Sequence, residues 1–187
     1  MISNAYILLS GGIDSTAALD FFIRNNYATQ CVFVNYKQLS SKNELHAVER
    51  IATHYKVPLK VIEIGNLPSS ADGFILGRNL FLVSIALMSF PFKSGSLVMG
   101  IHSDTTYPDC TPGFVNKTQE MLNLYSKGAI NFRNPFITWK KLDIWQYCIE
   151  NKVPTGLTYS CELGKVQPCG ICLSCKDIQK INAFEGK

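Results

Sequence analysis

The sequence lacks the features that mark several classes of protein. It has no apolar run of the ~18 residues that a membrane-spanning helix requires. The segment MISNAYILLSGG has neither the basic start nor the long apolar stretch of a signal peptide. No block is rich in lysine and arginine, so direct nucleic-acid binding is not expected. These absences predict a cytoplasmic protein with no membrane partner.

The composition is that of a globular domain. Hydrophobic residues make up 47% of the 187 residues and charged residues only 17%, which excludes disordered and fibrous chains. A chain of this length can bury a continuous core as one domain. The net charge of +4 is mildly basic and suits anionic small molecules such as nucleotides.

Short apolar runs alternate with longer helical patterns along the chain. We expect strands at residues 5–9, 31–36, 59–64 and 96–101. We expect helices after the first run and over residues 42–55, 78–90, 118–124 and 140–151. The 78–90 helix is apolar nearly all round, so we expect it to be buried. The alternation predicts an α/β fold, with a mostly parallel sheet, helices on both faces and ligands at the carboxyl ends of the strands.

A glycine loop follows the first predicted strand and begins the first predicted helix. Its residues are Ser10, Gly11, Gly12, Ile13, Asp14, Ser15 and Thr16. Glycines let the backbone turn tightly and approach an anion, and the helix start adds free N–H groups and a positive dipole end. The loop lacks the GK[ST] ending of a Walker loop, and serine and aspartate also cap ordinary strand–helix turns. The residues alone leave two interpretations open, a phosphate-binding loop and a capped turn.

Four of the seven cysteines lie close together near the end of the sequence. Cys161, Cys169, Cys172 and Cys175 follow the spacing C-x7-C-x2-C-x2-C. Four thiolates complete a tetrahedral zinc site and leave no open position for water, which favours a structural Zn²⁺. An iron–sulfur cluster and four buried cysteines without a metal are the alternatives.

The cysteines divide the chain into two regions. We expect residues 1–155 to form a nucleotide-binding α/β domain. We expect residues 156–187 to form a zinc-binding hook packed on that domain. Cys31, on an apolar strand, and Cys148, on a helix face, are expected to be core residues.

The motif SGGxDS after a strand resembles the pyrophosphate loop of the N-type ATP pyrophosphatases, the PP-loop superfamily with an adenine nucleotide alpha hydrolase-like fold. The likeness to one family within it, the 7-cyano-7-deazaguanine synthases of queuosine biosynthesis, runs almost end to end. Its segments are SGGIDST at 10–16, Tyr36-x-Gln38, Gly77-Arg78-Asn79, GIHSDTTYPDCTPGF at 100–114, NPFITWKKLDIW and TYSC…PCGICLSC. The YPDC element combined with the four-cysteine ending is the specific part of this likeness.

The resemblance implies an ATP-dependent ligase that forms a C–N bond on a deazapurine. The substrate carboxylate would attack the α-phosphate of ATP, and ammonia would displace AMP to give an amide. A second adenylation, on the amide oxygen, would lead to the nitrile. The products would be 7-cyano-7-deazaguanine, AMP and pyrophosphate. The resemblance further implies Mg²⁺ at the phosphates, Zn²⁺ in the hook and a homodimer.

The resemblance also assigns roles to individual residues. It implies ATP binding by Ser10, Gly11, Gly12, Asp14, Ser15 and Thr16. It implies catalytic roles for Asp14, Ser15 and Arg78. It implies substrate binding by Gln38, Arg78, Asp104, Tyr107 and Asp109. An aspartate would accept hydrogen bonds from a guanine-like N1–H and amine; the alternative for each aspartate is loop capping.

Two departures from the family pattern bear on function. Ser40 stands where a histidine belongs, with Glu44 displaced by one residue, and the segment 65–77 is shorter than usual. One alternative is therefore a relative from an anti-phage operon, an antiviral defence enzyme that joins the deazapurine to a partner protein or another amine. A second is a PP-loop tRNA-modifying enzyme, although Cys110 is the only loop cysteine outside the four-cysteine group.

Overall fold

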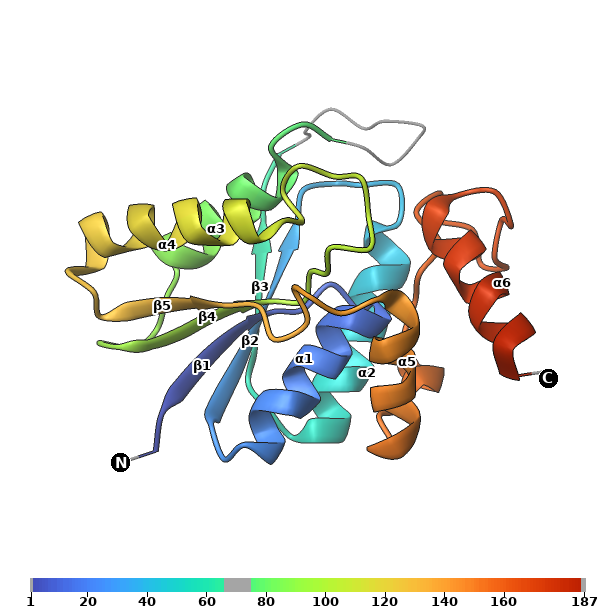
Figure 1. Cartoon of the computed structure of the whole chain (residues 1–187), viewed down its shortest axis with the longest axis horizontal. Coiled ribbons are helices and arrows are strands. Elements are labelled where there is room, and N and C mark those ends of the chain that lie inside the picture. Colours follow the sequence, from blue (N-terminus) through green and yellow to red (C-terminus); the bar gives the residue numbers. More distant parts are fainter. Residues whose placement is uncertain (1, 66–74, 186–187) are drawn as a thin grey trace.

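The structure, a computed structural model, describes residues 2–65 and 75–185. Its centre is a five-stranded sheet with the order β3-β2-β1-β4-β5 (Figure 1). The strands are β1 Asn4–Leu8, β2 Ala28–Asn35, β3 Leu59–Glu63, β4 Gly95–Met99 and β5 Ile130–Arg133. All neighbouring strands are parallel, which confirms the expected parallel sheet.

The order in which strands are added reverses beside β1. The chain adds β2 and β3 on one side of β1 and then returns to add β4 and β5 on the other side. In parallel sheets of this kind, the segments that follow the two central strands leave in opposite directions and open a crevice at the carboxyl ends. Here these segments are the glycine loop after β1 and residues 100–111 after β4. The topology therefore brings together two of the segments singled out in the sequence.

Helices cover both faces of the sheet, as expected. Helices α1 Ile13–Arg24, α2 Ser41–Tyr55 and α5 Lys141–Glu150 lie on one face, and α3 Arg78–Met88 and α4 Pro112–Ser126 lie on the other (Figure 1). A short 3-10 turn, Thr155–Leu157, leads toward helix α6, Leu173–Glu185, which contacts α5. None of the helices that the structure describes has the length and apolar character needed to cross a bilayer.

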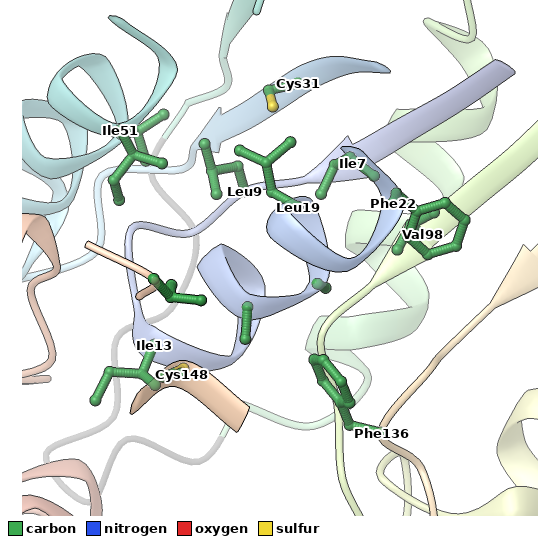
Figure 2. Packing of buried hydrophobic residues seen from close by; sticks show 14 of the residues in the cluster. Ile7, Leu9, Ile13, Leu19, Phe22, Cys31, Ile51, Val98, Phe136 and Cys148 are labelled. Atoms are coloured by element: carbon green, nitrogen blue, oxygen red, sulfur yellow. The ribbon is translucent and has the colours of Figure 1, made fainter. Parts of the chain in front are cut away.

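Each face of the sheet buries a separate apolar core. Successive side chains of a strand point to opposite faces, so Ile7 packs with α1 whereas Tyr6 packs on the side of α3. Figure 2 shows the first core, in which Leu19 of α1 lies close to Ile7. Cys31 and Cys148 are buried in the same core, so the prediction for these two cysteines is confirmed.

The prediction that the helix at residues 78–90 is buried all round is wrong. Within α3 the buried residues are Asn79, Val83 and Ala86, while Leu80 is 43% exposed and Met88 is 84% exposed. The helix packs on the sheet through one side only. Helix α3 therefore presents apolar side chains to the surface of the single chain. The sequence pattern alone does not distinguish such an exposed apolar surface from a buried core.

The sequence does not predict strand β5. Its buried residues, Ile130 and Phe132, alternate with the exposed Asn131 and Arg133. An edge strand of four residues with this alternation contains no apolar run, so it gives little signal. Most of the shortened 65–77 segment lies outside the described residues.

Candidate functional site

A cavity of about 450 Å³ lies at the carboxyl ends of β1, β2 and β4. This volume is within the usual range for small-molecule sites. Apolar strand residues such as Val34 and Met99 form part of the lining, and charged residues from several loops and helices converge on it. The cavity therefore occupies the crevice that the sheet topology creates.

The glycine loop passes very close to helix α2. Gly11 has a φ of +82°, and a Cβ at this position would lie 3.0 Å from the carbonyl oxygen of Glu44 and 3.1 Å from Cβ of Ala47. Gly100, directly after β4, allows an equally close approach of the backbone to helix α1. A Cβ on Gly100 would lie 2.6 Å from the carbonyl oxygen of Asp14. Both glycines thus let three elements meet at one edge of the cavity.

Hydroxyl groups fix the shape of the glycine loop. The Ser15 hydroxyl donates to the Gly12 carbonyl at 3.1 Å and accepts from the backbone N–H of Ser10 at 3.2 Å. The Thr16 hydroxyl donates to the same Gly12 carbonyl at 2.8 Å. Ser10, Gly12, Asp14 and Ser15 line the cavity. Gly11 and Thr16 are not among the described lining residues, so they contribute to the shape of the loop and not to the cavity surface.

Asp14 forms a close ion pair inside the cavity. The Lys141 Nζ donates to Oδ1 of Asp14 at 2.6 Å and to Oδ2 at 2.7 Å. Lys141 is the first residue of α5 and also lines the cavity. The sequence assigns no role to Lys141. It belongs to a lysine pair at the start of the predicted helix at 140–151, and nothing local relates that pair to the glycine loop.

His102 lies beside this ion pair. Its side chain is 7% exposed, and Nε2 is 3.7 Å from Oδ2 of Asp14. Burial lowers the pKa of His102; Lys141 lowers it further, while Asp14 and Asp104 act in the opposite direction. Nδ1 is buried and has no hydrogen-bond partner among the described residues. The imidazole is therefore neutral at pH 7 and is held against a charged pair.

The two predicted aspartates hold the backbone of neighbouring helices. Asp104 lines the cavity, and its Oδ2 accepts from the backbone N–H of Lys141 at 3.2 Å. Oδ2 of Asp109 accepts from the backbone N–H of Asn79 at 3.3 Å, at the start of α3. Asp109 is outside the described lining, whereas Tyr107 belongs to it. Both carboxylates are thus engaged in capping, the alternative that the sequence left open.

A second polar group lies where β2 ends. Gln38, Glu44 and Arg78 line the cavity together with Tyr36. Gln38 Nε2 donates to Oε2 of Glu44 at 2.6 Å, and the Ser40 hydroxyl donates to Oε1 at 2.6 Å. Burial raises the pKa of Tyr36, and the nearby Arg78 guanidinium counteracts this shift. The predicted residues Gln38 and Arg78 therefore line the same part of the cavity as Glu44, to which the sequence assigns no role.

The four clustered cysteines form a site that fits a tetrahedral metal ion. The sulfur atoms of Cys161, Cys169, Cys172 and Cys175 all lie within 4.8 Å of one another. The Cys169 and Cys175 sulfurs are 3.8 Å apart, which equals the sulfur–sulfur separation of about 3.8 Å that Zn–S bonds of ~2.3 Å produce in a tetrahedron. Backbone N–H groups of Cys172 and Ile171 lower the pKa of the Cys169 thiol to about 6, which favours the thiolate.

The cysteine-bearing segment forms one wall of the cavity. The backbone N–H of Tyr159 donates to the carbonyl of Gly11 at 2.9 Å, directly behind the glycine loop. Asn43 of α2 donates to the carbonyl of Gly164 at 3.0 Å. Glu162 and Asp177 are among the lining residues from this segment. The cysteine-bearing segment is therefore joined by hydrogen bonds both to the glycine loop and to helix α2.

Comparisons with known proteins find relatives over most of the chain. The sequence model of the family described as "Queuosine biosynthesis protein QueC" matches residues 4–72 and 68–186. A 7-cyano-7-deazaguanine synthase of Acetivibrio thermocellus is 28% identical, over 91% of this chain and 89% of the relative. Another, from Nautilia profundicola, is 29% identical over 98% of this chain and 94% of the relative.

Among solved structures, the fold is similar to that of the U34-tRNA thiolase NcsA from Methanococcus maripaludis, which was determined with its [4Fe-4S] cluster. The TM-score is 0.55 at 14% identity, covering 98% of this chain and 67% of the other. A likeness at this level of identity concerns the fold alone. The sequence relatives are therefore the more informative comparison.

Proposed function

The chain belongs to the QueC family of queuosine biosynthesis proteins, and we propose that it is a 7-cyano-7-deazaguanine synthase that adenylates a deazapurine carboxylate with ATP. The observation that carries this proposal is the convergence of the glycine loop, the Asp14–Lys141 pair and Arg78 on one cavity. Family membership supplies the substrate class, and the cavity supplies groups suited to phosphate chemistry.

The chemical problem is that a carboxylate is a poor electrophile. Attack of its oxygen on the α-phosphorus of ATP breaks the bond to the β-phosphate and releases pyrophosphate. The oxygen then leaves as part of AMP when ammonia attacks the carbonyl carbon and forms the amide. In the second round the amide oxygen is adenylated in the same way, and loss of AMP and protons leaves the nitrile. The protein mainly positions the reactants and stabilises the phosphate charge.

The glycine loop is suited to hold the pyrophosphate part of ATP. Gly12 has no side chain in the way, and the first turn of α1 provides free N–H groups at the cavity. The Ser10 and Ser15 hydroxyls face one another at 3.1 Å, so either can turn to a phosphate oxygen. Gly11 and Thr16 would act by keeping the loop in this shape.

Lys141 and Arg78 are the cations that would meet the phosphates. Lys141 is already fixed beside the loop by Asp14, and Arg78, the first residue of α3, lies near Tyr36. Positive groups that are positioned before the reaction stabilise the charge that develops on the leaving pyrophosphate. We assign Lys141 to the pyrophosphate side and Arg78 to the α-phosphate or the substrate carboxylate.

The carboxylate of Asp14 fits a role in holding Mg²⁺, since a carboxylate, serine hydroxyls and phosphate oxygens are the oxygen donors that this ion prefers. Bound Mg²⁺ would neutralise phosphate charge. The four thiolates of the cysteine site would hold Zn²⁺ with no open position, so its contribution would be structural. We propose on this basis that residues 156–187 form a hook that the metal fixes against the domain of residues 1–155.

His102 is suited to accept the proton that the nitrogen nucleophile loses. Ammonia attacks as the neutral molecule and must release protons to become an amide. A buried imidazole with a lowered pKa is neutral at pH 7 and can take up such a proton. Asp14, close to Nε2, would then stabilise the imidazolium.

We also propose that the protein is a homodimer. The half-exposed Leu80 and the exposed Met88 give α3 an apolar surface that a second copy would cover. Light scattering coupled to size-exclusion chromatography measures the mass directly. A monomer at all concentrations would contradict this part of the proposal.

The central experiment is to incubate the protein with ATP, Mg²⁺, 7-carboxy-7-deazaguanine and ammonia, and to identify the products by mass spectrometry. We expect the nitrile, AMP and pyrophosphate. Release of AMP only when a partner protein is added would instead indicate conjugation to a larger amine, and release only with tRNA would indicate a tRNA-modifying enzyme. Absence of AMP under all three conditions would refute an adenylating function.

A further inference from the structure

Glu44 is a cavity carboxylate whose two oxygens are both held by neutral donors. The Ser40 hydroxyl donates to Oε1, and Gln38 Nε2 donates to Oε2, each at 2.6 Å. Glu44 is half-buried and belongs to the first turn of α2. A carboxylate oxygen can accept more than one hydrogen bond, so each oxygen retains a free acceptor direction.

The donors that hold Glu44 are themselves fixed. The side-chain carbonyl of Gln38 accepts from the backbone N–H of Tyr36 at 3.1 Å, which leaves its amide group directed at Glu44. Ser40 is buried, and its backbone carbonyl accepts from the N–H of Glu44 at 2.9 Å. The carboxylate plane is therefore set before any ligand binds. Such preorganisation reduces the entropic cost of binding.

Ser40 and Glu44 lie four residues apart, and the hydrogen bond between their side chains lets the serine hydroxyl position the glutamate. Burial raises the pKa of Glu44, although Ser40, Gln38 and Arg78 counteract this effect. A ligand that donates hydrogen bonds would compensate for this burial.

We propose that Glu44 is the residue that selects the guanine-type base, by accepting hydrogen bonds from its N1–H and exocyclic amine. This inference rests on the proposed function. The guanine-type edge presents two adjacent donors, which match the two acceptors of a carboxylate. The corresponding edge of adenine presents one donor and one acceptor, so a carboxylate does not match it. Asp104 and Asp109, the residues expected from the sequence, already accept from backbone N–H groups.

The test compares binding of the deazapurine acid with binding of its analogue that lacks the exocyclic amine, using isothermal titration calorimetry. For the unaltered protein we expect the analogue to bind roughly 10- to 100-fold more weakly. For Glu44→Gln we expect weaker binding of the acid and little remaining difference between the two ligands. Glu49→Gln, an exposed glutamate of the same helix, is the matched control and should discriminate like the unaltered protein.

Three results would overturn the inference. One is a Glu44→Gln protein that still discriminates between the two ligands. Another is an unaltered protein that binds both equally. The third is a Glu44→Gln protein whose affinity falls for ATP alone, since the glutamate would then face adenine. If Glu44→Gln does not fold, Glu44→Asp replaces it, because the shorter side chain withdraws the carboxylate from the base, and unchanged discrimination in that variant has the same meaning.

Because calorimetry measures binding and not turnover, this test is separate from that of the proposed function. A protein that releases no AMP but loses base discrimination through Glu44→Gln would refute the proposed reaction and support the inference. A protein that makes the nitrile but discriminates without Glu44 would support the proposed reaction and refute the inference.

Discussion

Lys141 Nζ lies 2.6 and 2.7 Å from the two carboxylate oxygens of Asp14, although the residues are 127 positions apart in the sequence. The pair joins the first turn of α1 to the first turn of α5. In the absence of a nucleotide, Lys141 neutralises a carboxylate that would otherwise repel phosphate. Under the proposed function, this lysine would already lie within the cavity when ATP binds and would share its donors with a phosphate oxygen.

Replacing Lys141 with alanine should lower kcat/KM for AMP formation about 10²- to 10³-fold, because a preorganised cation at the phosphates is lost. The adjacent Lys140→Ala is the control, since its side chain is exposed. Coupled measurement of pyrophosphate release gives both rates. Equal activity of the two variants would show that Lys141 has no part in the reaction.

Replacing Gly11 with alanine should reduce the free energy of unfolding by about 2–4 kcal/mol, from the strained φ and the contacts with α2. Gly128→Ala separates these causes. Gly128 has a similar φ of +80°, but a Cβ there meets no atom within 4 Å. It should cost only about 1 kcal/mol. Urea unfolding of both variants measures the difference, and equal losses would mean that the contact with Glu44 and Ala47 is unimportant.

Removing the metal should loosen the wall of the cavity as well as the cysteine segment. We expect about one equivalent of zinc per chain by atomic absorption, with no visible iron–sulfur absorbance. The Cys172→Ser variant should lose this zinc and have a lower Tm. The Cys31→Ala variant, which changes a buried core cysteine, should keep its zinc. A variant lacking zinc with unchanged Tm and unchanged hydrogen exchange at Tyr159 would contradict the coupling.

Stability should decrease at high pH through the partly buried tyrosine Tyr147. The Tyr147 hydroxyl donates to Oδ2 of Asp20 at 2.8 Å, and burial, followed by this carboxylate, raises the pKa of Tyr147. The folded state therefore holds the phenolic proton more tightly than the unfolded state. This contribution is fully present below about pH 10, the unfolded pKa, and is lost as the pH rises through the folded pKa.

Tyr147→Phe should lower the free energy of unfolding at pH 7 by about 2 kcal/mol, since Asp20 loses a donor. Above pH 10 its stability should fall less steeply than that of the unaltered protein. Chemical denaturation at several pH values tests both statements. Parallel curves for the two proteins would assign the high-pH loss to other groups.

The sequence predicts the parts of the site that are contiguous in the chain. The glycine loop and the four cysteines each carry their signal within a few residues, and both occupy the expected places. Lys141 and Glu44 carry no such local signal, because their importance comes from neighbours that the fold brings to them. Tyr107 and Arg78, to which the family likeness assigns substrate binding, line the cavity, whereas Asp109 holds the start of α3.

The hydrogen bond from Tyr159 to the carbonyl of Gly11 has a consequence for synthesis of the protein. On the ribosome, the glycine loop emerges before its partner at residue 159 and before the cysteines beyond it. The carbonyl of Gly11 therefore gains this partner only once the cysteine-bearing segment has been made and has folded back onto the glycine loop.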